Sequence, residues 1–214
     1  MDELRTLLSN NRRWAARVKA ADPEFFSSRA SQQTPRFVWV GCSDSRVPSD
    51  TVVGLKPGDL FVHRNIGNQI VHSDLNAMSV LQFAIDVLRV RHIIVCGHFG
   101  CGAVRAALGN EPLGLVDQWL RHVRDVRQEH HEELAALPDE RARADRLCEL
   151  NTLQQVQNIA RTGIAQDAWR RGQFLAVHGW VYDIHTGLVN DLGATVDGPD
   201  GIPAIYRLGD SGSP

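Results

Sequence analysis

The stretch His92-Ile-Ile-Val-Cys-Gly-His-Phe-Gly-Cys-Gly102 decides the fold. Its first half is a continuous apolar and β-branched run, as expected of a parallel strand that is covered on both faces. Its second half is a glycine-rich turn that carries a histidine and a cysteine. In open α/β sheets, ligands bind beyond the carboxyl ends of the strands. The stretch therefore predicts both a buried strand and a site at its end.

Short apolar runs elsewhere predict further strands, and helical spacings lie between them. Strands are expected at residues 36–40, 60–64 and 174–178, with a short edge strand at 188–192. Apolar side chains at helical spacing predict helices around residues 77–88, from 115 to a break near Pro138, and over 153–164. Strands that alternate with helices indicate an α/β fold, with a central, mostly parallel β-sheet flanked by helices.

Composition excludes several classes of function. Of the 214 residues, 43% are hydrophobic and 22% are charged, and the formal net charge is −2. The sequence contains no basic cluster, so we do not expect binding to nucleic acid or to an anionic membrane surface. The charged amino-terminal segment does not resemble a signal peptide, and no run reaches the ~20 apolar residues of a membrane span. We therefore expect a cytoplasmic protein whose four cysteines serve metal binding or packing.

A second strand ends in a candidate metal ligand. Residues 36–40 run through Gly41 into Cys42. If this strand neighbours the one at 92–96, Cys42, His98 and Cys101 converge on one point. Two thiolates and one imidazole suit Zn²⁺, and three protein ligands leave the fourth position open, as in catalytic sites.

Asp44 and Arg46 follow the first candidate ligand closely. An arginine fork on a carboxylate fixes it and keeps it ionised. An ionised Asp44 beside zinc can orient the zinc-bound water, or it can bind the metal as a fourth ligand and close the site. The pair could also be an ordinary loop ion pair, and Cys42 alone could be a buried apolar residue.

Both motifs resemble a known family. Cys42-Ser-Asp-Ser-Arg46 and His98-Phe-Gly-Cys101 are similar to the two signature motifs of the β-class carbonic anhydrases, most closely those of the bacterial branch. The resemblance implies zinc held by Cys42, His98 and Cys101, with Asp44 and Arg46 as a catalytic dyad. It implies a lyase that reversibly hydrates carbon dioxide to bicarbonate and a proton, by attack of zinc-bound hydroxide on CO2.

The same resemblance implies assembly and regulation. A homodimer or homotetramer is expected, and a second bicarbonate site would match Trp39, Arg64 and Tyr182. Trp39 could instead be plain core, and Arg64 could pair with an acid. If Asp44 closes the site near neutral pH, activity should rise in mildly alkaline buffer.

Three segments are expected along the chain. Residues 1–30 are expected to form a helical arm whose apolar stripe must be buried, on its own domain or on a second subunit, and we expect it to pack on a partner subunit. Residues 31–195 form the zinc-binding α/β catalytic domain, and residues 196–214 a polar and flexible tail.

Other readings of the cysteine and glycine pattern stay open. The same fold could hydrolyse another small linear molecule such as carbon disulfide, or could hold a structural zinc closed by Asp44 or Cys96. The glycines of residues 97–102 do not match the dinucleotide-binding order G-x-G-x-x-G. Cys96 and Cys148 are expected to be packing residues.

Overall fold

The computed structural model describes residues 2–209 of the 214-residue chain. The chain divides into two units, Met1–Thr34 and Pro35–Pro214. None of the helices in the described range is both long and apolar enough to cross a membrane.

The first unit consists of two helices, α1 (Asp2–Ala21) and α2 (Phe25–Ala30). The rings of Trp14 and Phe26 meet edge to face, with centroids 5.7 Å apart, and join the two helices. No side chain of α1 is buried, and its leucines at positions 4, 7 and 8 are 60–68% exposed. The apolar stripe expected from the leucine spacing is therefore present, and neither helix of this unit covers it.

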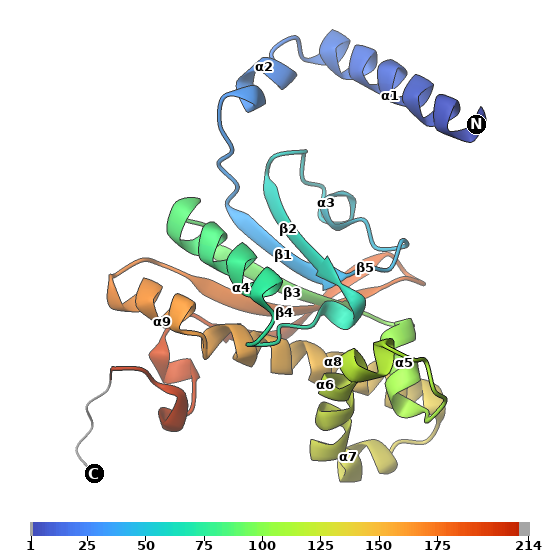
Figure 1. The fold of residues 1–214 in the computed structure, drawn as a ribbon, viewed down its shortest axis with the longest axis vertical. Coiled ribbons are helices and arrows are strands. Elements are labelled where there is room, and N and C mark those ends of the chain that lie inside the picture. The colour runs from blue at the N-terminus through green and yellow to red at the C-terminus, as the bar shows by residue number, and fades with distance from the viewer. Residues whose placement is uncertain (1, 210–214) are drawn as a thin grey trace. The chain divides into compact units, whose positions relative to one another are not determined.

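The second unit is built on one five-stranded sheet (Figure 1). The strand order is β2-β1-β3-β4-β5; the first four strands are mutually parallel and β5 runs antiparallel to β4. The fold class predicted from the sequence is thus confirmed. The strands are β1 (Phe37–Cys42), β2 (Leu60–Asn65), β3 (His92–His98), β4 (Ala176–Asp183) and β5 (Leu188–Val196).

Helices and single turns connect the strands. The α-helices of this unit are α3 (Ser49–Val52), α4 (Leu75–Gln82), α5 (Gly102–Leu108), α6 (Val116–Glu129), α7 (His131–Ala135), α8 (Glu140–Ala160) and α9 (Gly163–Arg170). The shorter turns are η1 (Ile66–Asn68), η2 (Phe83–Val87), η3 (Pro199–Gly201) and η4 (Ala204–Tyr206).

Helix α8 is longer than its apolar spacing predicted. It begins at Glu140, where the Asp139 carboxylate accepts a hydrogen bond from the Ala142 N–H at 2.8 Å. An aspartate at this position satisfies one of the free N–H groups of the first turn. The first half of the helix is rich in charged residues, so the apolar period that reveals a helix is weak there.

Three apolar cores surround the sheet. Side chains from α4, α8 and α9 pack on one face against residues such as Val38, Val40 and Val95. On the other face, Trp39, Ile94 and Cys96 form a smaller core. A third core gathers α5, α6, α7 and α8 around the carboxyl ends of the central strands. Both faces of β1 and β3 are buried, which agrees with their unbroken apolar sequences.

Residues 199–209 are held against the body of this unit. Ile202 is buried, and the side-chain amide of Gln166 donates to the Tyr206 carbonyl at 2.9 Å. The Arg161 guanidinium lies 4.3 Å from the centre of the Tyr206 ring. The last five residues of the expected flexible tail, 210–214, lie outside the described residues.

Candidate metal centre

The neighbouring strands β1 and β3 bring three side chains to one point. Candidate ligand atoms of Cys42, His98 and Cys101 all lie within 4.8 Å of one another, and the two sulfurs are 3.9 Å apart. Two thiolates at tetrahedral angles, each ~2.3 Å from zinc, would be about 3.8 Å apart. All three side chains are at most 6% exposed. The spacing of the donors therefore fits a zinc ion.

His98 presents one free nitrogen to this cluster. Its Nδ1 lies 3.1 Å from the Phe99 carbonyl oxygen, so we assign the proton to Nδ1. Its Nε2 is buried and has no hydrogen-bond partner among the described residues. A buried polar atom without a partner is costly, and a bound metal would remove that cost.

Gly100 makes the two-ligand turn possible. Its φ of +71° lies in the left-handed region, which glycine adopts without strain. The chain can therefore reverse between His98 and Cys101 within three residues. Cys101 then sits at the first position before α5, where the N–H groups of the helix favour negative charge.

The two candidate thiol ligands are within hydrogen-bond distance of each other, with their sulfurs 3.9 Å apart. A hydrogen bond from the Cys101 thiol lowers the pKa of Cys42 to about 4, and N–H groups of Gly67 and Asp44 add to this effect. The same bond, together with burial, raises the pKa of Cys101. Cys42 is therefore the more readily ionised of the two thiols, and a cation at this point would favour loss of the proton from both.

In Cys96 and Cys148, burial outweighs the hydrogen bonds that would lower the pKa of the thiol. Burial raises the pKa of the Cys96 thiol to about 12 and also raises that of Cys148. The Cys148 thiol donates to the His98 carbonyl at 3.1 Å, so this residue supports the strand that carries a candidate ligand. Both cysteines lie outside the candidate ligand cluster.

Asp44 and Arg46 form a forked ion pair beside the cluster. Arg46 donates from Nε to Oδ1 at 2.9 Å and from Nη2 to Oδ2 at 2.6 Å. This fork holds the pKa of Asp44 well below its usual range, and the Arg46 backbone N–H contributes in the same direction. Asp44 Oδ2 lies 3.7 Å from His98 Nε2. A fixed, ionised carboxylate therefore faces the point where the candidate ligands meet.

Arg64 braces the loop that carries Cys42 and Asp44. Its Nε donates to the Cys42 carbonyl at 2.8 Å, and its Nη2 donates to the Asp44 carbonyl at 2.6 Å. Trp39 and Gly41 share the sheet face of Arg64, because Gly41 and Arg64 are partners in the ladder between β1 and β2. Tyr182, the third residue of the expected bicarbonate site, packs in the same core as Trp39.

A buried polar network holds Gly67, a residue that sequence reasoning did not single out. The Gly67 carbonyl accepts hydrogen bonds from Gln69 Nε2 at 2.6 Å and Asn151 Nδ2 at 3.0 Å. These bonds hold the carbonyl group of the residue whose own N–H reaches the Cys42 sulfur, so they help to position that residue. The signal available beforehand was a glycine two residues after a strand, followed by two amides, in Ile66-Gly-Asn-Gln69.

Together, these features define an α/β protein with a three-ligand metal site of the catalytic type. The profile of the carbonic anhydrase family matches residues 37–189. The "Carbonic anhydrase" of Emericella nidulans is 44% identical over 202 residues, which cover 94% of this chain and 88% of the relative. The chain therefore belongs to the carbonic anhydrase family.

Solved structures specify the class. One of two tetrameric β-carbonic anhydrases from the filamentous ascomycete Sordaria macrospora matches with a TM-score of 0.87 and 37% identity, covering 92% of this chain and 100% of that chain. The Coccomyxa β-carbonic anhydrase in complex with acetazolamide matches with a TM-score of 0.87 and 41% identity, covering 91% and 88%. These matches confirm the β class, whose members are zinc enzymes, and with it the predicted cofactor.

The expected bacterial branch is not supported. The Emericella and Sordaria proteins are fungal, and their identities to this chain are 44% and 37%. The two signature motifs could not separate these branches, because they report only the residues around the metal.

Proposed function

We propose that this protein catalyses the reversible hydration of carbon dioxide to bicarbonate and a proton. The observation that carries the proposal is a three-donor site whose open side faces a fixed carboxylate. Cys42, His98 and Cys101 would hold the zinc ion, and their mutual distances fit its coordination. When bound, zinc supplies a Lewis acid that makes water a nucleophile near neutral pH.

Asp44 has the position and the charge to direct the attacking water. Its Oδ2 is 3.7 Å from the free nitrogen of His98 and is held by Arg46. An ionised carboxylate accepts a hydrogen bond from water and thereby aims a lone pair at carbon dioxide. Arg46 also donates to the Gly100 carbonyl at 3.3 Å, which ties this pair to the turn between two candidate ligands. Arg46 is therefore assigned to orient Asp44 and keep it ionised.

We also propose a regulatory bicarbonate site at Trp39, Arg64 and Tyr182. The support for it is that Arg64 holds the backbone next to the candidate metal ligand Cys42. Bicarbonate bound by the Arg64 guanidinium would compete with the Cys42 and Asp44 carbonyls that this side chain now holds. Loss of that brace would free Asp44 to turn toward the metal. Inhibition by bicarbonate in the unmodified protein, but not in Tyr182→Phe, would support this site, and equal inhibition in both would remove it.

We also propose a homo-oligomer. The uncovered leucines of α1 need a partner surface, and the Sordaria macrospora relatives are tetrameric. Sedimentation equilibrium should give a dimer or a tetramer, and deletion of residues 2–21 should weaken it. A monomer at micromolar concentration would contradict the proposal.

A reducing compartment such as the cytoplasm suits the thiols. All four cysteines are free and buried. Thiolate ligands are retained best where disulfides do not form. Fractionation of cells that express the tagged protein would test this location.

The decisive experiment is stopped-flow hydration of carbon dioxide with zinc-quantified protein at pH 7 and pH 8.5. Turnover that is lost on chelation and restored by zinc would establish the activity. Absence of turnover at both pH values, with one zinc per chain, would overturn the proposed function.

A further inference from the structure

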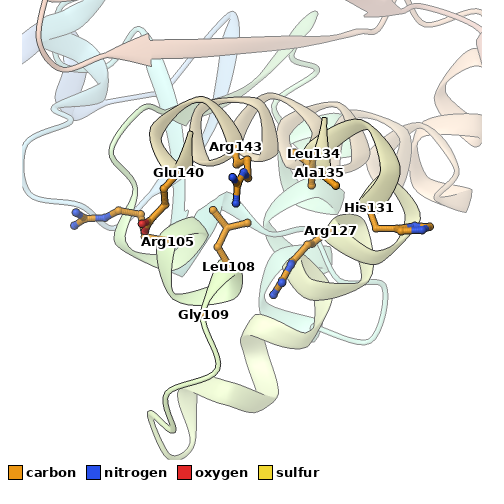
Figure 2. A pocket seen from close by; sticks show the side chains of 9 residues that line it. All are labelled: Arg105, Leu108, Gly109, Arg127, His131, Leu134, Ala135, Glu140 and Arg143. Carbon is orange, nitrogen blue, oxygen red and sulfur yellow. The ribbon is translucent and has the colours of Figure 1, made fainter. Parts of the chain in front are cut away.

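Four helices line a pocket that is open to solvent and that the metal centre does not use. It has a volume of about 820 Å³ and lies among α5, α6, α7 and α8 (Figure 2). None of its lining residues belongs to the candidate ligand cluster or to the Asp44–Arg46 pair. Leu108, Leu134 and Ala135 give it an apolar wall.

The charges around this pocket are predominantly positive. Arg105, Arg127 and Arg143 line it together with a single acid, Glu140. Figure 2 shows Arg143 of α8 next to the Leu108 side chain and Arg127 of α6 further along, and both residues line the pocket. Arg105 points outward on the side of Glu140.

Arg124 and Arg146, which lie on the same two helices, are paired with carboxylates, whereas Arg127 and Arg143 are not in the described part of the chain. Arg124 on α6 bonds Asp117 at 3.1 Å, and Arg146 on α8 bonds Glu149 at 2.7 Å. Within residues 2–209, no carboxylate forms an ion pair with Arg127 or Arg143. Two like charges that face one cavity repel each other, and an anion between them would relieve this repulsion.

Arg127 is also held in place. Its Nη1 donates to the Ala107 carbonyl at 3.1 Å, at the carboxyl end of α5. This bond orients the guanidinium and leaves its other N–H groups free for a ligand. A guanidinium that is fixed in advance loses less entropy when it binds an oxyanion.

We propose that this pocket binds the phosphate group of a small molecule, between Arg127 and Arg143. The planar fork of arginine matches the oxygen atoms of phosphate, and an apolar wall suits the carbon body of a phosphate ester. The volume is that of a site for a small organic ligand. Helix α5 lines the pocket and directly follows Cys101, so such a ligand would contact the helix that begins at a candidate metal ligand.

The test is isothermal titration of the full-length, zinc-loaded protein with inorganic phosphate and, separately, with phenyl phosphate. We expect one site per chain and a loss of affinity of tenfold or more in both Arg127→Gln and Arg143→Gln. Arg121→Gln on α6 removes a charge outside the pocket and should bind as the unmodified protein does. Thermal unfolding of each variant shows that it is folded.

The outcomes separate the sources of the phosphate group. Tighter binding of phenyl phosphate would support an ester, and equal affinity would support free phosphate. Binding that is unchanged in both pocket variants would place the anion at the metal and overturn the proposal. So would absence of binding by either probe. The readout is binding, so it stands whether or not the protein hydrates carbon dioxide.

Discussion

The Nε atom of Arg64 lies 2.8 Å from the carbonyl oxygen of Cys42, so a side chain of β2 braces the main chain of β1 next to a candidate metal ligand. The second arm of the same guanidinium reaches the Asp44 carbonyl. One side chain therefore sets the backbone on both sides of Ser43. Arg64 therefore positions the backbone of Cys42 and Asp44 through their carbonyl oxygens and is not assigned a contact with the reacting atoms.

Replacement of Arg64 should loosen this loop. For Arg64→Gln we expect zinc affinity to fall by about 10- to 100-fold, the usual effect of removing support behind a metal ligand. Competition with a chromogenic chelator measures it. Arg91→Gln, at the opposite end of the sheet, is the control and should bind zinc normally. Equal affinity in Arg64→Gln and the unmodified protein would show that the loop needs no brace.

Removal of the Asp44 carboxylate should spare the metal and impair turnover. Asp44→Ala is expected to keep one zinc per chain, because Asp44 is outside the three-residue cluster. Turnover should fall by about 10²-fold or more, the range for loss of a residue that accepts a proton or hydrogen bond in the transition state. Asp50→Ala, on α3, serves as the control. Full activity in Asp44→Ala would exclude Asp44 from the mechanism.

Replacement of a candidate ligand cysteine should abolish zinc binding, whereas replacement of a packing cysteine should not. Cys101→Ala removes a candidate ligand and should abolish stoichiometric zinc, measured by elemental analysis. Cys96→Ala removes a buried neutral thiol from β3 and should retain it. Zinc loss in the Cys96 variant alone would reassign the ligand set.

A pH profile tests the position of Asp44. Arg46 holds the pKa of Asp44 below its usual range, so the carboxylate is ionised throughout pH 6.5–9 and its own titration adds no change there. If Asp44 occupies the fourth metal position near neutrality, hydroxide competes better as pH rises. Activity should then be several-fold higher at pH 8.5 than at pH 7, by stopped-flow assay. A flat profile from pH 6.5 to 9 would argue against this switch.

The close packing of β3 on α8 predicts a large stability effect. A Cβ atom at Gly97 would lie 2.3 Å from Thr152 Oγ1 and 3.0 Å from Cys148 Sγ. Gly97→Ala should therefore lower the free energy of unfolding in urea by about 1–3 kcal/mol, as overpacking does. At Gly102 the added atom meets nothing within 4 Å, so Gly102→Ala is a matched control. Similar stability for both variants would mean that α8 can retreat from β3.

The features that could be predicted from the sequence were those indicated by short, local patterns of residues. The strands appeared as short apolar runs, and the ligand cluster as polar residues at two strand ends. The start of α8 at Glu140 was not predicted, because charged residues obscure the apolar period there. The hydrogen bonds of Arg64, and those of Gln69 and Asn151 to Gly67, depend on side chains that meet only in the folded chain. No local spacing could have indicated them.

The candidate ligands come from β1 and from the end of β3, which are separated in sequence by more than fifty residues but paired in the sheet. Neither strand alone offers a complete set of donors, so a newly made chain can capture zinc at full strength only after the centre of the sheet has formed. Zinc binding would thus indicate that β1 and β3 have paired. A chain trapped with these two strands apart would be recognisable by its low zinc content.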